Sequence, residues 1–173
     1  MTTTPRLRSE SVRRTGDEPR IDADLRERVR ARLAHSDQRL TNHRERLIAV
    51  LAAAVKPLTI PEIGDADPEL AVSSIYRNLT KLEELGVVHR VVTAGDFAHY
   101  ELAEDLTEHH HHHIVCSRCG AVEDFEASVK LEEAVRDASR RVVRRTGFRI
   151  ERHVVDLIGL CTNCASVADR TRT

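Results

Sequence analysis

Two cysteine pairs with the same spacing constrain the fold of this chain more than any other feature. Cys116 and Cys119 form one C-x-x-C pair, and Cys161 and Cys164 form a second. Two such pairs that meet in space supply the four thiolates of a closed, tetrahedral zinc site, which holds structure. The second half of the chain is therefore predicted to fold around a structural Zn²⁺, with sensing or chemistry placed elsewhere.

Two disulfides are the alternative use of these four cysteines. The first residues lack the apolar stretch of a secretion signal, and the chain has no run of about 18 apolar residues that could cross a membrane. We therefore expect a cytoplasmic protein without a membrane partner. Thiols stay reduced in that compartment, which favours zinc over disulfides.

Composition sets two further limits. Hydrophobic residues make up 40% of the 173 residues but aromatic residues only 3%, so a core of this chain would gain from a metal ion. The formal net charge is −1, and overall charge therefore gives no sign of nucleic-acid binding. Any contact with DNA has to come from a local basic face.

The first half of the chain has the pattern of a winged helix-turn-helix domain. Apolar residues recur every four positions from Ile21 to Leu33, and further helices are predicted after Thr41, from Thr59 and over 71–85. Two β-rich segments, 87–93 and 97–102, follow and are separated by a hairpin signal. The last three of these helices and then the hairpin have the order of a winged helix, which binds double-stranded DNA.

The second half has the pattern of a small α/β domain. A strand ends at Cys116, a second lies near 121–125, a long helix runs from about Ser128 to Arg145, and 148–160 alternates like a strand. The predicted fold class is α+β. The predicted segments are a disordered basic tail (1–20), the winged-helix domain (21–103), a hinge (104–108), the metal-binding domain (109–165) and a disordered tail (166–173).

Side chains suited to DNA cluster around the predicted helix over 71–85. Hydroxyl, phenol and guanidinium groups near a helix start fit the major groove and its flanking phosphates, whereas the alternative is an ordinary solvated helix face. The predicted DNA-contacting residues are Arg39, Arg44, Ser73, Ser74, Tyr76 and Arg77.

Five consecutive histidines precede the first cysteine pair. On a strand, alternate residues point the same way, so His109, His111 and His113 would share one face while His110 and His112 share the other. Imidazoles on two faces could serve two separate metal sites.

The chain at this point resembles the ferric uptake regulator (Fur) family of bacterial metal-responsive repressors. The resemblance covers about residues 38–165. It rests on the following segments: Arg39-Leu40-Thr41, Ser74-Ile75-Tyr76-Arg77-Asn78-Leu79, Leu85-Gly86-Val87-Val88, Tyr100-Glu101-Leu102, the histidine run, Cys116-x-x-Cys119-Gly120 and Gly159-Leu160-Cys161-x-x-Cys164. It implies a homodimer joined through the C-terminal domain, which closes on an operator when metal binds.

The resemblance also implies ligand sets. The four cysteines match the structural zinc ligands, and His111, His113, Glu101 and Asp124 match a sensing site. His89 falls where zinc-sensing members place a ligand, and no ligand stands near Thr59, where iron sensors have a histidine. His89 and the histidine run favour Zn²⁺ as the sensed cation, whereas the acidic ligands suit Fe²⁺ or Mn²⁺ and leave an iron, manganese or peroxide sensor as the alternative.

A third site is predicted from the other strand face. It would use His110, His112 and His153 with an acid from near the long helix, Glu126 or Glu132, of which Glu132 is our choice. A zinc hydrolase with Glu101 or Asp124 as general base is a remote alternative, because the chain has no H-E-x-x-H helix. A metal-storage or protein-interaction module that binds no DNA is another.

Overall fold

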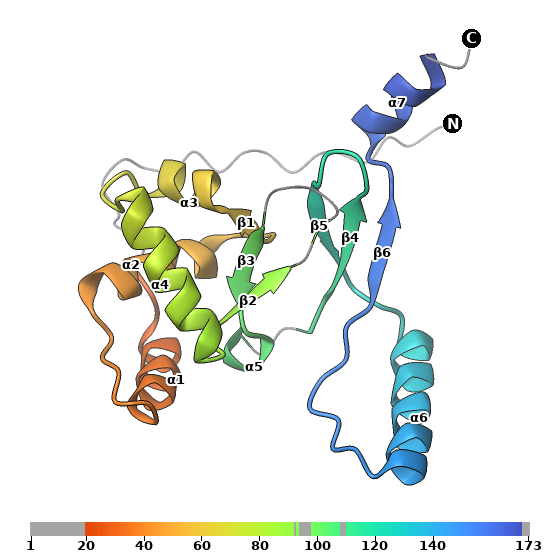
Figure 1. The fold of residues 1–173 in the computed structure, drawn as a ribbon, viewed down its shortest axis with the longest axis horizontal. Helices are drawn as coiled ribbons and strands as arrows, with labels where there is room; N and C mark the ends of the chain where they lie inside the picture. The colour runs from red at the N-terminus through yellow and green to blue at the C-terminus, as the bar shows by residue number, and fades with distance from the viewer. Residues whose placement is uncertain (1–19, 92, 94–97, 108–109, 171–173) are drawn as a thin grey trace, which may run out of the picture.

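The computed structural model describes residues 20–91, 93, 98–107 and 110–170. The chain forms two lobes, each built around a three-stranded sheet (Figure 1). None of the helices in these residues is long and apolar enough to cross a membrane. The predicted basic tail lies outside the described residues apart from Arg20.

The N-terminal lobe, residues 20–107, has a continuous apolar core made by its helices and the face of its sheet. Its elements are α1 (Ala23–Ala34), α2 (Asn42–Ala53), β1 (Leu58–Thr59), α3 (Ile60–Ala66), α4 (Val72–Glu84), β2 (Val88–Val91), β3 (His99–Leu102) and α5 (Glu104–Thr107). The three helices α1, α2 and α3 start at side-chain caps, which are Asp22, Thr41 and Thr59. Thr59 and Glu62 form the reciprocal capping box that their spacing predicts.

The strands of this lobe form an antiparallel sheet in the order β1-β3-β2. α4 packs beside it and buries Ile75, Leu79 and Leu82 on one stripe, so that the opposite stripe faces outward. The order of a winged helix-turn-helix, three helices (α2, α3 and α4) and then a hairpin (β2 and β3), is confirmed, although the predicted hairpin turn at 94–96 lies outside the described residues.

The segment expected to be a polar hinge is different. Residues 104–107 form the short helix α5, and Leu106 is buried in the core of the N-terminal lobe. Arg28 donates a hydrogen bond to the carbonyl oxygen of Leu106, and Arg32 pairs with Asp105. One buried leucine among charged residues was too weak a pattern to predict this, but it fixes α5 to α1.

The C-terminal lobe, residues 110–170, carries a sheet in the order β5-β4-β6. Its elements are β4 (His112–Cys116), β5 (Val122–Phe125), α6 (Val129–Thr146), β6 (Asp156–Gly159) and α7 (Thr162–Arg170). β4 pairs antiparallel with β5 and parallel with β6. Ser128 caps the start of α6, and Gly147, with a φ of 72°, ends it in the left-handed conformation.

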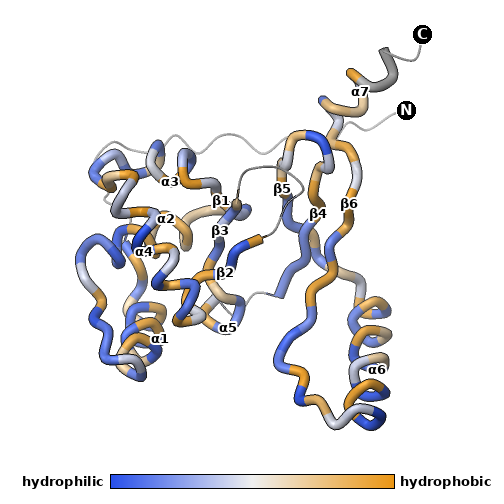
Figure 2. The backbone as a smooth tube through the Cα atoms, viewed as in Figure 1, coloured by the Kyte–Doolittle hydropathy of each residue, from blue (hydrophilic) through white to orange (hydrophobic). Residues whose placement is uncertain are grey.

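Two segments of this lobe depart from the prediction. Only Asp156–Gly159 of the alternating stretch 148–160 forms a strand, and its four residues pair with His113–Cys116 of β4. The expected disordered tail from residue 166 is helical up to Arg170 as part of α7, which leads out of the second cysteine pair. Figure 2 shows hydrophobic residues along β6 and α6, and neither element contains a buried residue.

Candidate metal centres and DNA-binding surface

The four cysteines meet at the end of the C-terminal sheet. Parallel pairing sets Cys116 of β4 opposite Gly159 of β6, which brings the turn that carries Cys119 next to Cys161 and Cys164 at the start of α7. The four sulfur atoms all lie within 4.8 Å of one another, and Cys119 Sγ is 3.7 Å from Cys161 Sγ. Sulfurs around a tetrahedral zinc ion are about 3.8 Å apart, so the cluster fits Zn²⁺. All four cysteines are free, and the disulfide alternative is not adopted.

Backbone N–H groups stabilise a thiolate in the cysteine cluster, as cation binding requires. Hydrogen bonds from the backbone N–H groups of Cys161, Cys119 and Arg118 lower the pKa of Cys116 to about 6, which favours its thiolate. Hydrogen bonding with Cys161 and proximity to the other sulfurs raise the pKa of Cys164 to about 12. Four close thiols cannot all lose their protons unless a positive ion joins them, and this coupling explains why the two shifts are opposite.

The histidine run divides between two sites as the strand alternation predicts. His111 and His113 face one cluster, and His110 and His112 face the other. His109 lies outside the described residues. His112 and His113 are both buried within β4, which holds consecutive imidazoles on opposite faces of one strand.

The first histidine cluster joins the two lobes. Glu101 comes from β3 of the N-terminal lobe, whereas His111, His113 and Asp124 belong to the C-terminal lobe. Glu101 Oε2 lies 2.9 Å from His111 Nε2 and 3.1 Å from His113 Nε2. Asp124, directly opposite His113 on β5, has its carboxylate oxygens 3.9 Å from His111 Nε2 and 3.8 Å from His113 Nε2. Ligand atoms around a four-coordinate zinc are about 3.4 Å apart, so these four groups fit a divalent cation.

Electrostatics at this cluster favour the charged carboxylate of Glu101. Burial raises the pKa of Glu101, but hydrogen bonds from His113 and His111 outweigh burial and hold it below its ordinary value. Burial lowers the pKa of His113, and the hydrogen bond to Glu101 reverses this and raises it. Burial raises the pKa of Asp124. A cation bound here would replace the protons that the histidines share with Glu101 in these hydrogen bonds.

His89 is not among the groups that the structure brings together here. It lies on β2 directly opposite Glu101 of β3, yet its ring nitrogens lie outside the set of ligand atoms that converge. Burial lowers the pKa of His89, and the nearby guanidinium of Arg152 lowers it further. The five-residue sensing set predicted from the sequence is therefore a four-residue cluster in this structure.

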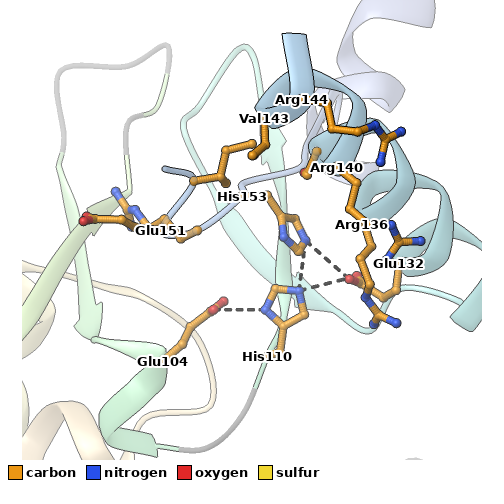
Figure 3. Close-up of a pocket in the computed structure, with 12 residues that line it drawn as sticks. Glu104, His110, Glu132, Arg136, Arg140, Val143, Arg144, Glu151 and His153 are labelled. Atoms are coloured by element: carbon orange, nitrogen blue, oxygen red, sulfur yellow. Dashed lines mark hydrogen bonds and ion pairs between the residues drawn. The ribbon is translucent and has the colours of Figure 1, made fainter. Parts of the chain in front are cut away.

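The second histidine cluster lies wholly in the C-terminal lobe (Figure 3). Glu132, in the first turn of α6, has Oε1 2.7 Å from His112 Nε2 and 3.4 Å from His110 Nε2, and its Oε2 lies 3.3 Å from His153 Nε2. His110 Nε2 and His153 Nε2 are 3.2 Å apart. The structure thus brings together His110, His112, Glu132 and His153, the set chosen for a third site, and selects Glu132 over Glu126.

The outward stripe of α4 carries the candidate DNA contacts. Tyr76 is 56% exposed, Ser73 and Arg77 are also exposed, and Ser74 is half-buried and accepts a hydrogen bond from Asn78. Arg77 Nε donates to the carbonyl oxygen of Ser73, which leaves the rest of its guanidinium on the surface. This arrangement fits a helix that enters the major groove.

The two arginines predicted near α2 differ in their surroundings. Arg39 is exposed. Arg44 donates hydrogen bonds to the side chain of Asn78, the carbonyl oxygen of Arg39 and the side chain of Gln38. Arg44 therefore braces α2 against α4, which is a structural task that the sequence did not indicate.

Comparisons with known proteins agree with this architecture. Residues 35–158 match the ferric uptake regulator family. A ferric uptake regulation protein of Bacillus subtilis (strain 168) is 30% identical over 152 residues, which cover 85% of this chain and 95% of that protein. The peroxide-responsive repressor PerR of Staphylococcus aureus (strain USA300) is 26% identical over 83% of this chain and 93% of its own length.

A solved structure is also similar. The ferric uptake regulator Fur of Helicobacter pylori, described as having three functional metal binding sites, superposes with a TM-score of 0.61 at 26% identity, over 82% of this chain and 91% of that one. The α+β fold with its N-terminal DNA-binding region is thereby confirmed. The chain belongs to the ferric uptake regulator family of metal-responsive transcription regulators, which are not enzymes, and the hydrolase alternative is set aside.

Proposed function

We propose that this chain is a metal-dependent repressor that binds an operator as a homodimer and controls metal-ion homeostasis in the cytoplasm, with Zn²⁺ as the sensed cation. One observation carries the proposal. Glu101 of the N-terminal lobe meets His111, His113 and Asp124 of the C-terminal lobe within bonding reach of a single ion. An ion held there would join the lobes and limit how α4 of each copy is oriented.

The mechanism follows from where these ligands lie. Each ligand has to come to about 2 Å from a bound ion, so β3 and β4 are held in one relative position. A dimer with a fixed separation of its two α4 helices can match a palindromic operator, whereas a dimer with freely moving N-terminal lobes matches it rarely. The strength of the response is limited by the difference in metal affinity between the two arrangements.

The donor set bears on the sensed metal. Two imidazoles and two carboxylates suit four-coordinate Zn²⁺. The same oxygens, and the position of His89 outside the cluster, give a second candidate, Fe²⁺ or Mn²⁺, because harder cations prefer oxygen ligands. Operator affinity measured against free Zn²⁺, Fe²⁺ and Mn²⁺ decides between them. Zinc is rejected if Fe²⁺ or Mn²⁺ stimulates binding at its cellular concentration and Zn²⁺ does not.

The structural zinc and a third ion have their own ligand sets. We assign Zn²⁺ to the four cysteines and a divalent cation to His110, His112, Glu132 and His153. The three clusters in the described part of the chain parallel the three sites described for the Helicobacter pylori protein. Elemental analysis of the native protein tests this count.

α4 is the proposed reading helix, and we expect its exposed stripe to set operator affinity. Tyr76→Ala and Arg77→Ala should each weaken specific operator binding by about 1–3 kcal/mol. If Arg77 contacts a phosphate, Arg77→Ala should also reduce the slope of log affinity against log salt concentration by about one. Gel-shift titrations at several salt concentrations measure both effects. Arg30→Ala, which removes the same charge from an exposed position of α1, is the control. Equal losses for Arg77→Ala and Arg30→Ala would rule α4 out as the reader.

The homodimer is proposed to form through β6 and α6. β6 is an edge strand of the C-terminal sheet, and Fur family regulators act as dimers. Exposed apolar residues lie on α6, on β6 and on the segment between them; they are Leu131, Val142, Ile150, Val154, Leu157 and Ile158. A second copy of this edge would pair its backbone groups and cover this surface.

We therefore expect Ile158→Asp to dissociate the dimer. A carboxylate in place of a side chain buried between copies costs about 3 kcal/mol or more, which is a loss of over roughly 100-fold in dimer affinity. Sedimentation equilibrium measures this loss. Val55→Asp introduces the same charge at a position of the N-terminal lobe that is 89% exposed and should leave the dimer intact. An unchanged Ile158→Asp dimer places the interface elsewhere.

A further inference from the structure

Glu104, the first residue of α5, touches the second histidine cluster without belonging to it. Its Oε2 lies 3.0 Å from Nδ1 of His110. Figure 3 shows this contact on one side of the His110 ring, and the contacts with Glu132 and His153 on the other side. The ring of His110 therefore stands between a carboxylate of the N-terminal lobe and a cluster of the C-terminal lobe.

This contact determines which nitrogen of His110 can bind a metal. A neutral imidazole carries one proton, and a carboxylate beside Nδ1 accepts the N–H placed there. The lone pair is then on Nε2, which is the nitrogen that faces Glu132 and His153. Metal-binding histidines commonly donate their other N–H to a carboxylate in this way, which orients the ring and raises its basicity.

Glu104 is held by the N-terminal lobe. It begins α5, whose Leu106 is 2% exposed and packs in the core of that lobe. The ion pair from Arg32 to Asp105 and the hydrogen bond from Arg28 to the Leu106 carbonyl attach the helix to α1. The position of the Glu104 carboxylate therefore moves with the N-terminal lobe.

We propose that Glu104 is the positioning residue for the second histidine cluster and that, through its bond to His110, a cation in that cluster ties the N-terminal lobe to the C-terminal lobe. The proposal rests on the metal-binding function proposed above. It gives this cluster a role that its four ligands lack, since all four belong to one lobe. The chain would then have two connections between its lobes, one made by Glu101 as a ligand and one by Glu104 acting on a ligand.

Cobalt(II) binding tests the positioning role. The full-length homodimer carrying His111→Ala and His113→Ala, with zinc in the cysteine cluster, leaves the second histidine cluster for Co²⁺, whose visible absorption reports coordination. Adding Glu104→Gln should weaken Co²⁺ binding about 10- to 100-fold. Glu151→Gln is the matched control, because Glu151 is an exposed carboxylate of the same cavity that points away from the histidines in Figure 3. Unchanged affinity in Glu104→Gln, or an equal loss in Glu151→Gln, overturns the positioning role.

Hydrogen exchange tests the tie between the lobes. In the same background, Co²⁺ should slow exchange of the α5 amides, and saturating Co²⁺ should fail to do so in Glu104→Gln. Equal protection of α5 in both proteins overturns the tie. These measurements use no DNA, so they remain decisive if operator binding proves independent of metal, the result that would reject the repressor function alone.

Discussion

Cys116→Ser should leave the C-terminal lobe unable to fold or to dimerise. The substitution removes one of four sulfurs that lie within 4.8 Å of one another, and the sulfur that it removes is the one with the pKa lowered to about 6. A structural zinc contributes about 10–16 kcal/mol to the folding of small domains, which exceeds what the thin core of this lobe could replace. That core has few members, and α6 and β6 contain no buried residue.

Elemental analysis, circular dichroism and sedimentation measure the loss. The expected result is one zinc fewer per chain, reduced helix content and a monomer. Asn163→Ala, which changes an exposed side chain between Cys161 and Cys164, should retain the metal and the dimer. A Cys116→Ser protein that keeps both would show that the sulfurs do not support the lobe.

The double substitution His111→Ala and His113→Ala should abolish metal-stimulated operator binding and leave a folded dimer. Nε2 of His111 and Nε2 of His113 approach the same oxygen of Glu101. Without these two imidazoles a cation bound to Glu101 of β3 has no histidine ligand that connects it to β4. Allosteric coupling commonly changes affinity by about 5- to 150-fold, and that factor should fall to about one. Operator titrations with and without metal measure it.

The control for this experiment is another pair of histidines. His35→Ala and His43→Ala change exposed residues of the N-terminal lobe that belong to none of the three ligand clusters. Metal should stimulate operator binding by this control protein as strongly as it stimulates binding by the unaltered protein. Stimulation that survives in His111→Ala/His113→Ala would move the sensing site to another cluster, and loss of the dimer would make these histidines structural.

Local chemistry made much of the structure predictable. The capping box of Thr59 and Glu62, the cap at Ser128 and the left-handed Gly147 depend on residues within a few positions of one another. The division of the histidine run depends only on strand alternation. Both cysteine pairs meet because a parallel strand pair joins them.

Features that depend on distant contacts were not predictable. Burial and the guanidinium of Arg152, more than sixty residues further along the chain, lower the pKa of His89, and neither can be predicted from the residues around His89. α5 is stabilised because Leu106 packs in the core of the N-terminal lobe and Arg28 donates a hydrogen bond to the carbonyl oxygen of Leu106. For the same reason the sequence predicts a hinge at Glu104, where the structure has the start of a helix. The predicted domain boundaries and the roles of the ligands remain predictions.

The alternation within β4 has a consequence for the assembly of the sheet. A slip of one position exchanges the two faces of a strand, yet in a homopolymeric stretch such as His109–His113 every face still receives imidazoles. The stretch is degenerate and cannot specify its own alignment. The residues that follow the stretch specify the register, because Val115 lies opposite Val122 of β5 and Ile158 of β6. A β4 strand paired one position out of register would therefore still present imidazoles to cations. The aliphatic contacts of Val115 are what favour the observed register over that one.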